Sequence, residues 1–248
     1  MSYFNKRLSA TYQIIFSCLL LFSTPAKPSA TNQQPGTHQD IAFHHQLLAI
    51  QNTNNNDRQT IDFFKKHLQG LNHHDIIQIS ASEFEQDQKR IQTKPFPRYS
   101  PPPTPQPKSI PINKIHFMQN SAWPVFTDQK HNVFSTSKNL KSRALSLNVL
   151  PKIHVWQDQQ HQIWTLDHRR LAAMTLAGNI KKTPVVWATK TEVNQSRSRF
   201  TTKNNGQSIL IYLTQRLGVV ISPRTALEDK KHSKTENSLL HSTAMHKQ

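Results

Sequence analysis

One short stretch holds most of the side chains that could do chemistry. Residues 164–174 read Trp-Thr-Leu-Asp-His-Arg-Arg-Leu-Ala-Ala-Met. Strand-forming residues lead into an acid, a histidine and two arginines, and helix-forming residues follow. The pattern predicts that the charged side chains lie where a strand ends and a helix begins. The first N–H groups of a helix lack partners, and its dipole is positive there, so such a junction is a typical anion site.

Each of these side chains has an expected role. Asp167 is the predicted cap of the helix, and Arg169 and Arg170 then fall in its first turn, where guanidinium groups can bind phosphate. His168 titrates near neutral pH and could exchange a proton with a substrate. His168 and Arg170 are the catalytic candidates, and His168 is also a candidate phosphate ligand beside the two arginines. His154 is expected on the neighbouring strand, from which it would support the same cleft. The structural alternative is a plain cap followed by solvated arginines.

The charge of the chain is basic and unevenly distributed. The 248 residues include 31 Lys and Arg against 14 Asp and Glu, which gives a net charge of +17. Residues 112–224 carry 16 basic and 4 acidic side chains, and so hold 12 of the 17 net charges. This excess favours nucleic acid or a nucleotide as the partner. A protein partner and a simple effect on solubility stay open. A divalent cation as cofactor also stays open: no paired carboxylates for a two-metal site are apparent, but acids distant in the sequence could converge.

The segment that carries this charge is predicted to be a domain of its own. Strand and helix patterns alternate along it, which indicates an α+β fold with a small mixed sheet and packed helices. Asn205-Gly206 is a strong hairpin signal. The expected elements are strands at 112–117, 153–156, 163–166 and 184–187, a helix from Ser137 to before Pro151, a helix from Asp167 to Gly178, and a hairpin over 200–211.

Four further segments are predicted outside this domain. Residues 1–30 have the basic start, short apolar run and small-residue exit of a secretory signal peptide, so the protein is expected to be secreted or periplasmic without a stable membrane anchor. Residues 31–94 are predicted to be helical and partly disordered, and residues 95–111 to be a proline-rich linker. Residues 225–248 are expected to be a polar tail.

The helical region of residues 31–94 is expected to have only a thin core. Apolar spacing predicts helices near residues 41–48 and 57–70, and a third over 75–89 with Ser82 and Glu85 as its capping box. The histidine pairs of this region lack the i, i+4 spacing of a metal site on one helix face, so we expect them to be solvated. They are His44-His45 and His73-His74.

The focal stretch, residues 164–174, resembles a known motif. Residues 166–173, Leu-Asp-His-Arg-Arg-Leu-Ala-Ala, look like the strand-to-helix phosphate motif of the ParB/sulfiredoxin superfamily. That motif reads Gly-Glu-Arg-Arg-x-x-Ala in ParB proteins and Gly-Cys-His-Arg-x-x-Ala in sulfiredoxins. In this alignment Asp167 replaces the glycine, His168 replaces the Glu or Cys, and Arg170 matches the shared arginine. The order of the flanking segments over residues 112–212 is similar to that of ParB-like domains in uncharacterised and toxin-type proteins.

The resemblance implies a ParB/sulfiredoxin-like fold and a function on phosphate. No cysteine stands at position 168, so sulfinic acid repair of the sulfiredoxin type is not available. ParB-like domains are often described as nucleases, and the leading interpretation is therefore a secreted ParB-like protein that acts on nucleic acid or a nucleotide, as a nuclease-type effector or toxin. One alternative is a non-catalytic basic module that binds nucleic acid or a host or envelope protein. Another is a nucleotide-dependent phosphotransferase.

The predicted signal peptide has a consequence that is simple to measure. Cleavage after Ala26 or Ala30 would remove Cys18, the only cysteine of the chain. We expect the protein recovered from a secreting host to have the corresponding lower mass and no thiol that reacts with a colorimetric reagent. Intact mass spectrometry of the secreted and cytosolic fractions checks this. A full-length cytosolic chain that retains Met1 and one reactive thiol would contradict export.

Overall fold

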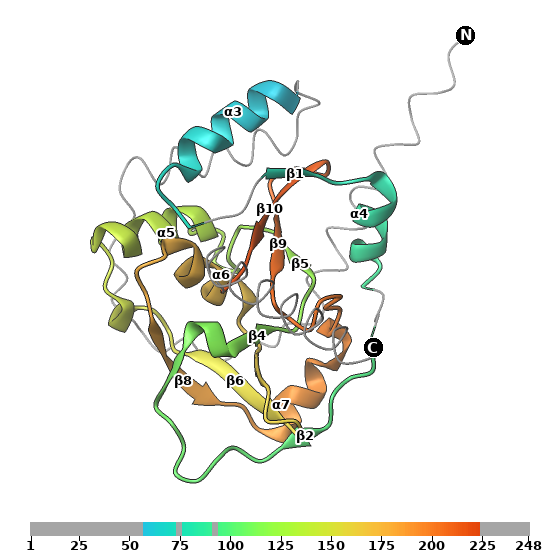
Figure 1. Ribbon diagram of the computed structural model, residues 1–248, viewed down its shortest axis with the longest axis vertical. Helices are drawn as coiled ribbons and strands as arrows, with labels where there is room; N and C mark the ends of the chain where they lie inside the picture. The colour runs from blue at the N-terminus through green and yellow to red at the C-terminus, as the bar shows by residue number, and fades with distance from the viewer. Residues whose placement is uncertain (1–56, 73–75, 91–93, 224–248) are drawn as a thin grey trace, which may run out of the picture. The chain divides into compact units, whose positions relative to one another are not determined.

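The protein has an α+β fold built on two curled sheets, as the sequence predicts. A computed structural model describes residues 57–72, 76–90 and 94–223 (Figure 1). The larger sheet has the strand order β3-β8-β6-β7-β4, with β2 paired to β6, and it mixes parallel and antiparallel neighbours. Its strands are β2 (Tyr99–Ser100), β3 (Ser109–Pro111), β4 (Ile115–Phe117), β6 (Ile153–Asp158), β7 (Ile163–Thr165) and β8 (Lys182–Trp187).

A second sheet and five described helices complete this part of the chain. The strand order of the second sheet is β1-β10-β9-β5. Its strands are β1 (Ile76–Gln78), β5 (Ser121–Ala122), β9 (Ile209–Tyr212) and β10 (Leu217–Ile221). The helices are α3 (Asp57–Leu68), α4 (Ala81–Gln88), α5 (Val133–Ser142), α6 (His168–Ala177) and α7 (Lys190–Gln195), with short 3-10 turns η1 (Ile112–Lys114), η2 (Leu147–Val149) and η3 (Arg197–Arg199). No helix in the described ranges combines the length and apolar character needed to cross a bilayer.

The elements around the focal stretch form as predicted. β6 and β7 are an antiparallel hairpin in which Val155 faces Thr165, and β7 leads directly into α6. α6 ends at Gly178, which has φ +76° and therefore the left-handed backbone of a typical helix terminus. All but two residues of α6 are buried, so the helix is held between the sheet and α5. This rigid setting fixes the start of α6 at the open end of the hairpin.

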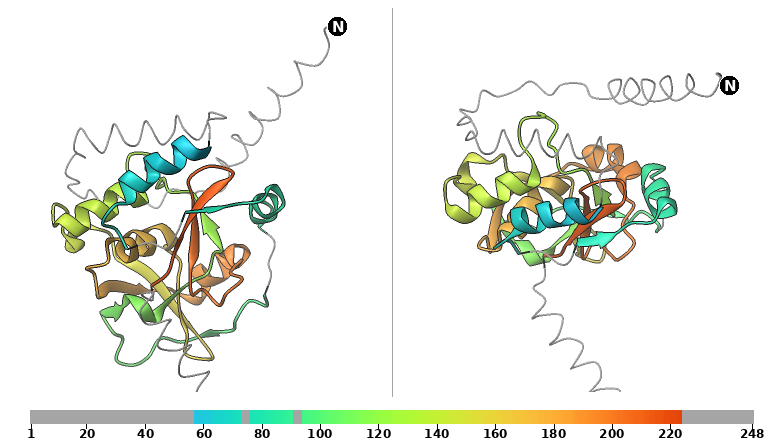
Figure 2. Two further views of the ribbon diagram at one scale, coloured as in Figure 1. Left: turned by 45° about the horizontal axis from the view of Figure 1, so that its top comes forward. Right: turned by 90° about the horizontal axis from the view of Figure 1, so that it is seen from above.

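The prediction of a separate helical region with a thin core is wrong for its described part. α3 begins at Asp57 and ends before Gly70, as expected, but it lies beside α5 in both views of Figure 2. Phe64 and Leu68 are fully buried in the same core as α5, α6 and both sheets. The centroid of the Phe64 ring is 6.3 Å from that of Phe134 in α5. Burial of such side chains stabilises the fold by roughly 2 kcal/mol each, which ties the segment to the domain.

The predicted helix over 75–89 is a three-residue strand followed by a shorter helix. Residues 76–78 form β1, which pairs with β10, and α4 begins only after Ser80. Ser80 and Glu83 form the capping box, in place of the predicted Ser82 and Glu85. β-branched Ile residues favour an extended backbone, and the exposed edge of β10 supplies the hydrogen bonds that hold them in it. Tertiary pairing therefore outweighs the local helical pattern.

The proline-rich segment does not lead away from the domain. Residues 99–100 pair with β6 and residues 109–111 pair with β8. Phe96 stacks on Trp156 with a centroid separation of 5.4 Å, and the indole N–H of Trp187 donates to the carbonyl of Pro107 at 3.1 Å. Proline is tolerated on edge strands because the missing N–H would face solvent. The segment is thus an edge of the sheet and not a free spacer.

Helix α5 both starts and ends earlier than predicted, since it stops at Ser142 and Arg143 has a left-handed backbone. Asn132 is the cap, and its side-chain oxygen accepts from the N–H groups of Phe134 at 3.0 Å and Ser135 at 2.9 Å. Ser137, the predicted cap, lies inside the helix and donates its hydroxyl to the carbonyl of Val133. A buried Asn with two N–H partners satisfies more of the helix start than Ser137 could.

The predicted hairpin is also displaced. β9 turns into β10 through residues 213–216, where the N–H groups of Leu213 and Thr214 both donate to the carbonyl of Leu217. Residues 200–206 instead bind across to β4, since the N–H of Phe117 donates to the carbonyl of Gly206 at 2.9 Å. The glycine serves a close approach between two segments and not a hairpin.

Three of the four tryptophans are accounted for by packing. Trp156 and Trp164 are buried in a second apolar cluster with Phe200, whereas Trp187 packs against the main core and stays partly exposed. Several expectations lie outside the described residues. They are the signal peptide, residues 31–40, the helix near 41–48, both histidine pairs and the tail over 225–248.

Gly206 provides a test of the fold. Its φ is +70°, and a Cβ placed there would lie 2.5 Å from the carbonyl oxygen of Phe117. We expect Gly206→Ala to lower the free energy of unfolding by roughly 2 kcal/mol or more, from backbone strain and the clash together. Gly70→Ala is the control, because Gly70 has φ +78° but its nearest neighbour would lie at 3.9 Å. Urea unfolding of both variants should show clearly the larger loss at Gly206, and equal losses would contradict the proposed clash.

Candidate functional site

The site is built where β7 passes into α6. The hydroxyl of Thr165 accepts from the N–H of Asp167 at 2.9 Å, and the N–H of Leu171 donates to the carbonyl of Asp167 at 3.1 Å. These bonds fix the backbone on both sides of the junction. α6 therefore begins one residue after Asp167, as the sequence predicts.

The side chain of Asp167 does not cap the helix, contrary to expectation. It makes no hydrogen bond to the first turn of α6. One carboxylate oxygen accepts from the backbone N–H of His154 at 2.6 Å and lies 3.0 Å from Nδ1 of the same residue. The other oxygen accepts from Nη2 of Arg170 at 2.6 Å. Charged donors from β6 and α6 outcompete the weaker bond to a helix N–H.

The electrostatics of this group follow from those contacts. Burial disfavours the charged form of Asp167, but the hydrogen bond from His154 and the charge of Arg170 outweigh it and lower the pKa of the carboxyl. The hydrogen bond to Asp167 raises the pKa of His154 despite partial burial of the ring. The side chain of His154 is 40% exposed and that of Asp167 is 16% exposed. The result is a histidine–carboxylate pair with the carboxylate inside and the imidazole at the surface.

Arg170 is engaged within the protein. Besides Asp167, its guanidinium donates to the carbonyl of Pro151 at 3.2 Å and to that of Lys152 at 3.0 Å. These bonds join the start of α6 to the start of β6. The geometry thus favours a positioning role for Arg170 over its predicted roles as phosphate ligand and catalytic group.

His168 points into the protein. It is 5% exposed, and in the described part of the chain neither ring nitrogen has a hydrogen-bond partner. Burial lowers the pKa of His168 to about 3, so the imidazole is neutral at pH 7. A buried neutral ring does not suit the predicted proton transfer with a phosphate at the surface. The candidate for that role moves from His168 to His154.

Arg169 lies close to a second arginine that sequence reasoning missed. Its Nε donates to the carbonyl of Trp123 at 3.0 Å, and the side chain is largely buried. Burial and the nearby charge of Arg199 lower the pKa of the Arg169 guanidinium. Arg199 closes the run Ser196-Arg197-Ser198-Arg199. Two basic residues in that run were the available signal, but nothing in the sequence placed them beside α6.

None of the acidic side chains of residues 112–223 forms an ion pair with Arg169 or Arg199. Three of the four accept hydrogen bonds elsewhere in the domain. Asp128 accepts from His131, Asp158 accepts from Trp164 and two backbone N–H groups, and Glu192 closes the capping box of α7. The fourth is Asp167, bound to His154 and Arg170. The described residues contain no group of three or more His, Cys, Asp and Glu side chains that could hold a metal ion.

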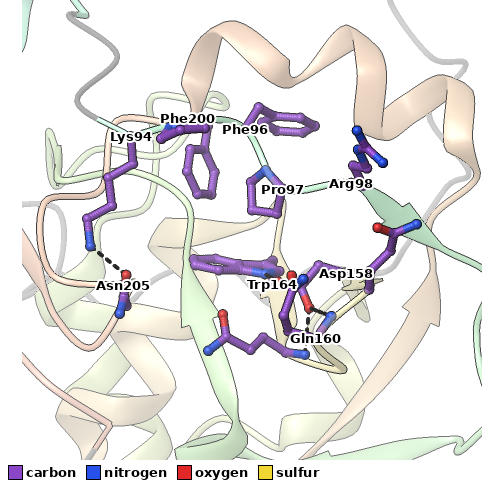
Figure 3. Close-up of a pocket in the computed structure, with 12 residues that line it drawn as sticks. Lys94, Phe96, Pro97, Arg98, Asp158, Gln160, Trp164, Phe200 and Asn205 are labelled. Carbon is purple, nitrogen blue, oxygen red and sulfur yellow. Dashed lines mark hydrogen bonds between the residues drawn. The ribbon is translucent and has the colours of Figure 1, made fainter.

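A cavity of about 510 Å³ lies at the other, closed end of the β6–β7 hairpin (Figure 3). Phe96, Trp164 and Phe200 contribute aromatic walls, and Lys94 and Arg98 stand at its rim. Nζ of Lys94 donates to the side chain of Asn205 at 2.6 Å. Among the described residues that line the cavity, the only acid is Asp158, which is 1% exposed, so their accessible charge is positive. The cavity was not predicted, because Lys94 and Trp164 are 70 positions apart in the sequence.

Comparison with known proteins adds no relative, since no family model, no curated protein and no solved structure matches the chain.

The histidine–carboxylate pair predicts a pH-dependent stability. Because the pKa of folded His154 is raised, its contribution to stability is fully present below the unfolded value near 6.5 and is lost as the pH rises through the folded pKa. We expect the stability difference between the natural protein and His154→Asn to be larger at pH 5.5 than at pH 9, on the scale of a partly exposed pair, up to about 1 kcal/mol. Urea unfolding across that range measures it. A difference that does not vary with pH would mean that the charge of His154 is not coupled to Asp167.

Proposed function

We propose that the protein binds nucleic acid through phosphate contacts at the start of α6. The observation that supports this most is the closeness of Arg169 and Arg199 without an acidic partner among the described residues. Two like charges near one another cost free energy unless an anion joins them. The side chain of Asp167 leaves the first N–H groups of α6 uncapped, and these can donate to the same anion.

The arrangement of η3 favours a polymer over a single nucleotide. Arg199 approaches the start of α6, while the guanidinium carbon of Arg197 lies 5.5 Å from the ring centroid of Phe96, which lines the cavity. Lys94 and Arg98 continue the positive charge along the rim. A chain of phosphates could contact both regions at once, and each contact would release counterions and add affinity. A host or envelope protein with an acidic surface is the competing partner.

We also propose where the protein acts and which family its domain resembles. We infer a secreted protein with a ParB/sulfiredoxin-like domain that meets nucleic acid after delivery, as an effector or toxin would. The support is the strand-to-helix junction with arginines in its first turn, together with the signal-like sequence of residues 1–30. Activity as a nuclease is the second candidate, and the exposed imidazole beside a buried carboxylate is the observation that favours it.

Substitution of the two arginines tests the binding proposal. We expect Arg169→Gln and Arg199→Gln each to weaken binding of a labelled single-stranded oligonucleotide about tenfold, the scale of one lost charge-assisted contact. Each should also lower the slope of log affinity against log salt by roughly one. Fluorescence anisotropy over a salt series measures both.

Arg143→Gln is the matched control for this experiment. Arg143 is exposed at the end of α5. The last turn of α5 meets the opposite end of α6, since Asn179 donates to the carbonyl of Leu140 at 3.2 Å. Equal losses in all three variants would show that only the net charge matters, and no loss in any of them would refute the proposed site. Circular dichroism of each variant confirms that the fold is retained.

A further inference from the structure

We propose that His154 is a catalytic acid and that the nucleic acid cleaved is RNA. This inference rests on the proposed binding function and adds a reaction to it. The side chain of His154 is 40% exposed, and Nδ1 lies 3.0 Å from the carboxylate of Asp167. In the described part of the chain Nε2 has no hydrogen-bond partner, so it is open to a substrate.

The ring of His154 is held in a defined orientation. Oδ2 of Asp167 accepts from the backbone N–H of His154 at 2.6 Å, so one oxygen fixes both the strand and the imidazole that it carries. Arg170 holds the other oxygen at 2.6 Å and is itself bound to two carbonyls at the start of β6. Asp167 and Arg170 are therefore positioning residues. The carboxylate fixes the proton on Nδ1, which leaves Nε2 as the nitrogen that exchanges a proton with substrate.

The charges that face His154 favour the protonated form. Asp167 raises the pKa of His154 by a hydrogen bond and by its charge, Glu192 raises it by charge alone, and Arg170 opposes both. Burial also opposes protonation, but the net direction is upward. A raised pKa keeps the imidazole protonated to a higher pH, which suits it to donate a proton to a leaving group.

RNA suits a site with a single general acid, because its 2′-hydroxyl supplies the nucleophile. The 2′-hydroxyl of the ribose attacks the neighbouring phosphorus and forms the O2′–P bond, while its proton passes to water. The P–O5′ bond breaks, and the leaving O5′ takes the proton from Nε2 of His154. The products are a 2′,3′-cyclic phosphate and a 5′-hydroxyl, and His154 regains its proton from solvent. DNA lacks the internal nucleophile, so this step is closed to it.

The location of the pair agrees with the binding site. Asp167 is the residue before α6, and Arg169 is its second residue. The charge of Asp167 and the charges of Arg169 and Arg199 all act on the buried ring of His168. The proposed acid and the proposed phosphate ligands therefore meet at one end of one helix. A phosphate held by the arginines would lie at the same end of α6 as the exposed imidazole.

The test uses the full chain and a doubly labelled RNA oligonucleotide, with binding and cleavage measured separately. We expect the RNA to be cleaved to a cyclic phosphate and the same sequence with 2′-deoxyriboses not to be cleaved. The two oligonucleotides should bind with the same affinity. His154→Asn keeps a side-chain N–H for Asp167 but lacks Nε2, and should lower the cleavage rate about 10²- to 10⁴-fold with binding retained. The rate of the natural protein should fall as the pH rises through the pKa of His154.

Two variants serve as controls. His67→Asn changes a histidine in the last turn of α3, near Lys138 of α5 and outside the proposed site, and should leave the rate unchanged. Asp167→Asn should move the pH profile to lower pH, which a merely structural role would not do. Binding without cleavage, or full activity in His154→Asn, would overturn the catalytic inference and leave the binding proposal standing. If the natural protein does not bind the oligonucleotide, both the binding proposal and the catalytic inference fail.

Discussion

The bonds around the carboxylate of Asp167 set the geometry of the whole site. This one group accepts from the backbone and ring of His154 on β6 and from Arg170 on α6. A carboxylate that is 16% exposed needs such donors, because a buried charge without partners is costly. The donors in turn lose their freedom to do anything else. Arg170 and the start of β6 are thereby held in place, whereas Nε2 of His154 makes no hydrogen bond within the described residues.

The focal stretch shows what a sequence can and cannot specify. Its strand-to-helix junction and the end of α6 at Gly178 follow from local pattern, and both form as predicted. The direction of each side chain from the first turn does not follow from pattern, because it depends on what packs there. His168 turns inward and Asp167 turns toward β6. The predicted catalytic histidine is therefore the one that is buried.

Contacts between distant segments explain most of the other differences. The sequence around Ile76 and Ile77 fits a helical pattern, but both residues pair with β10. Gly206 has the sequence context of a hairpin glycine, but it is needed for the close approach to Phe117. Arg199 could not be assigned to the site because 30 positions separate it from Arg169. Local propensity is a weak guide wherever a free edge or a buried neighbour supplies a larger free energy.

The proline-rich segment carries a consequence for how the chain responds to proteases. Residues 101–108 are mostly exposed, yet the residues on both sides of them pair with the same sheet. Upstream, α3 and β1 contribute to the main core and to the second sheet. A cut within these residues would nick the backbone without releasing either piece, because each piece buries apolar side chains against the other. The nicked protein would run as two fragments under denaturing conditions and as one particle under native conditions.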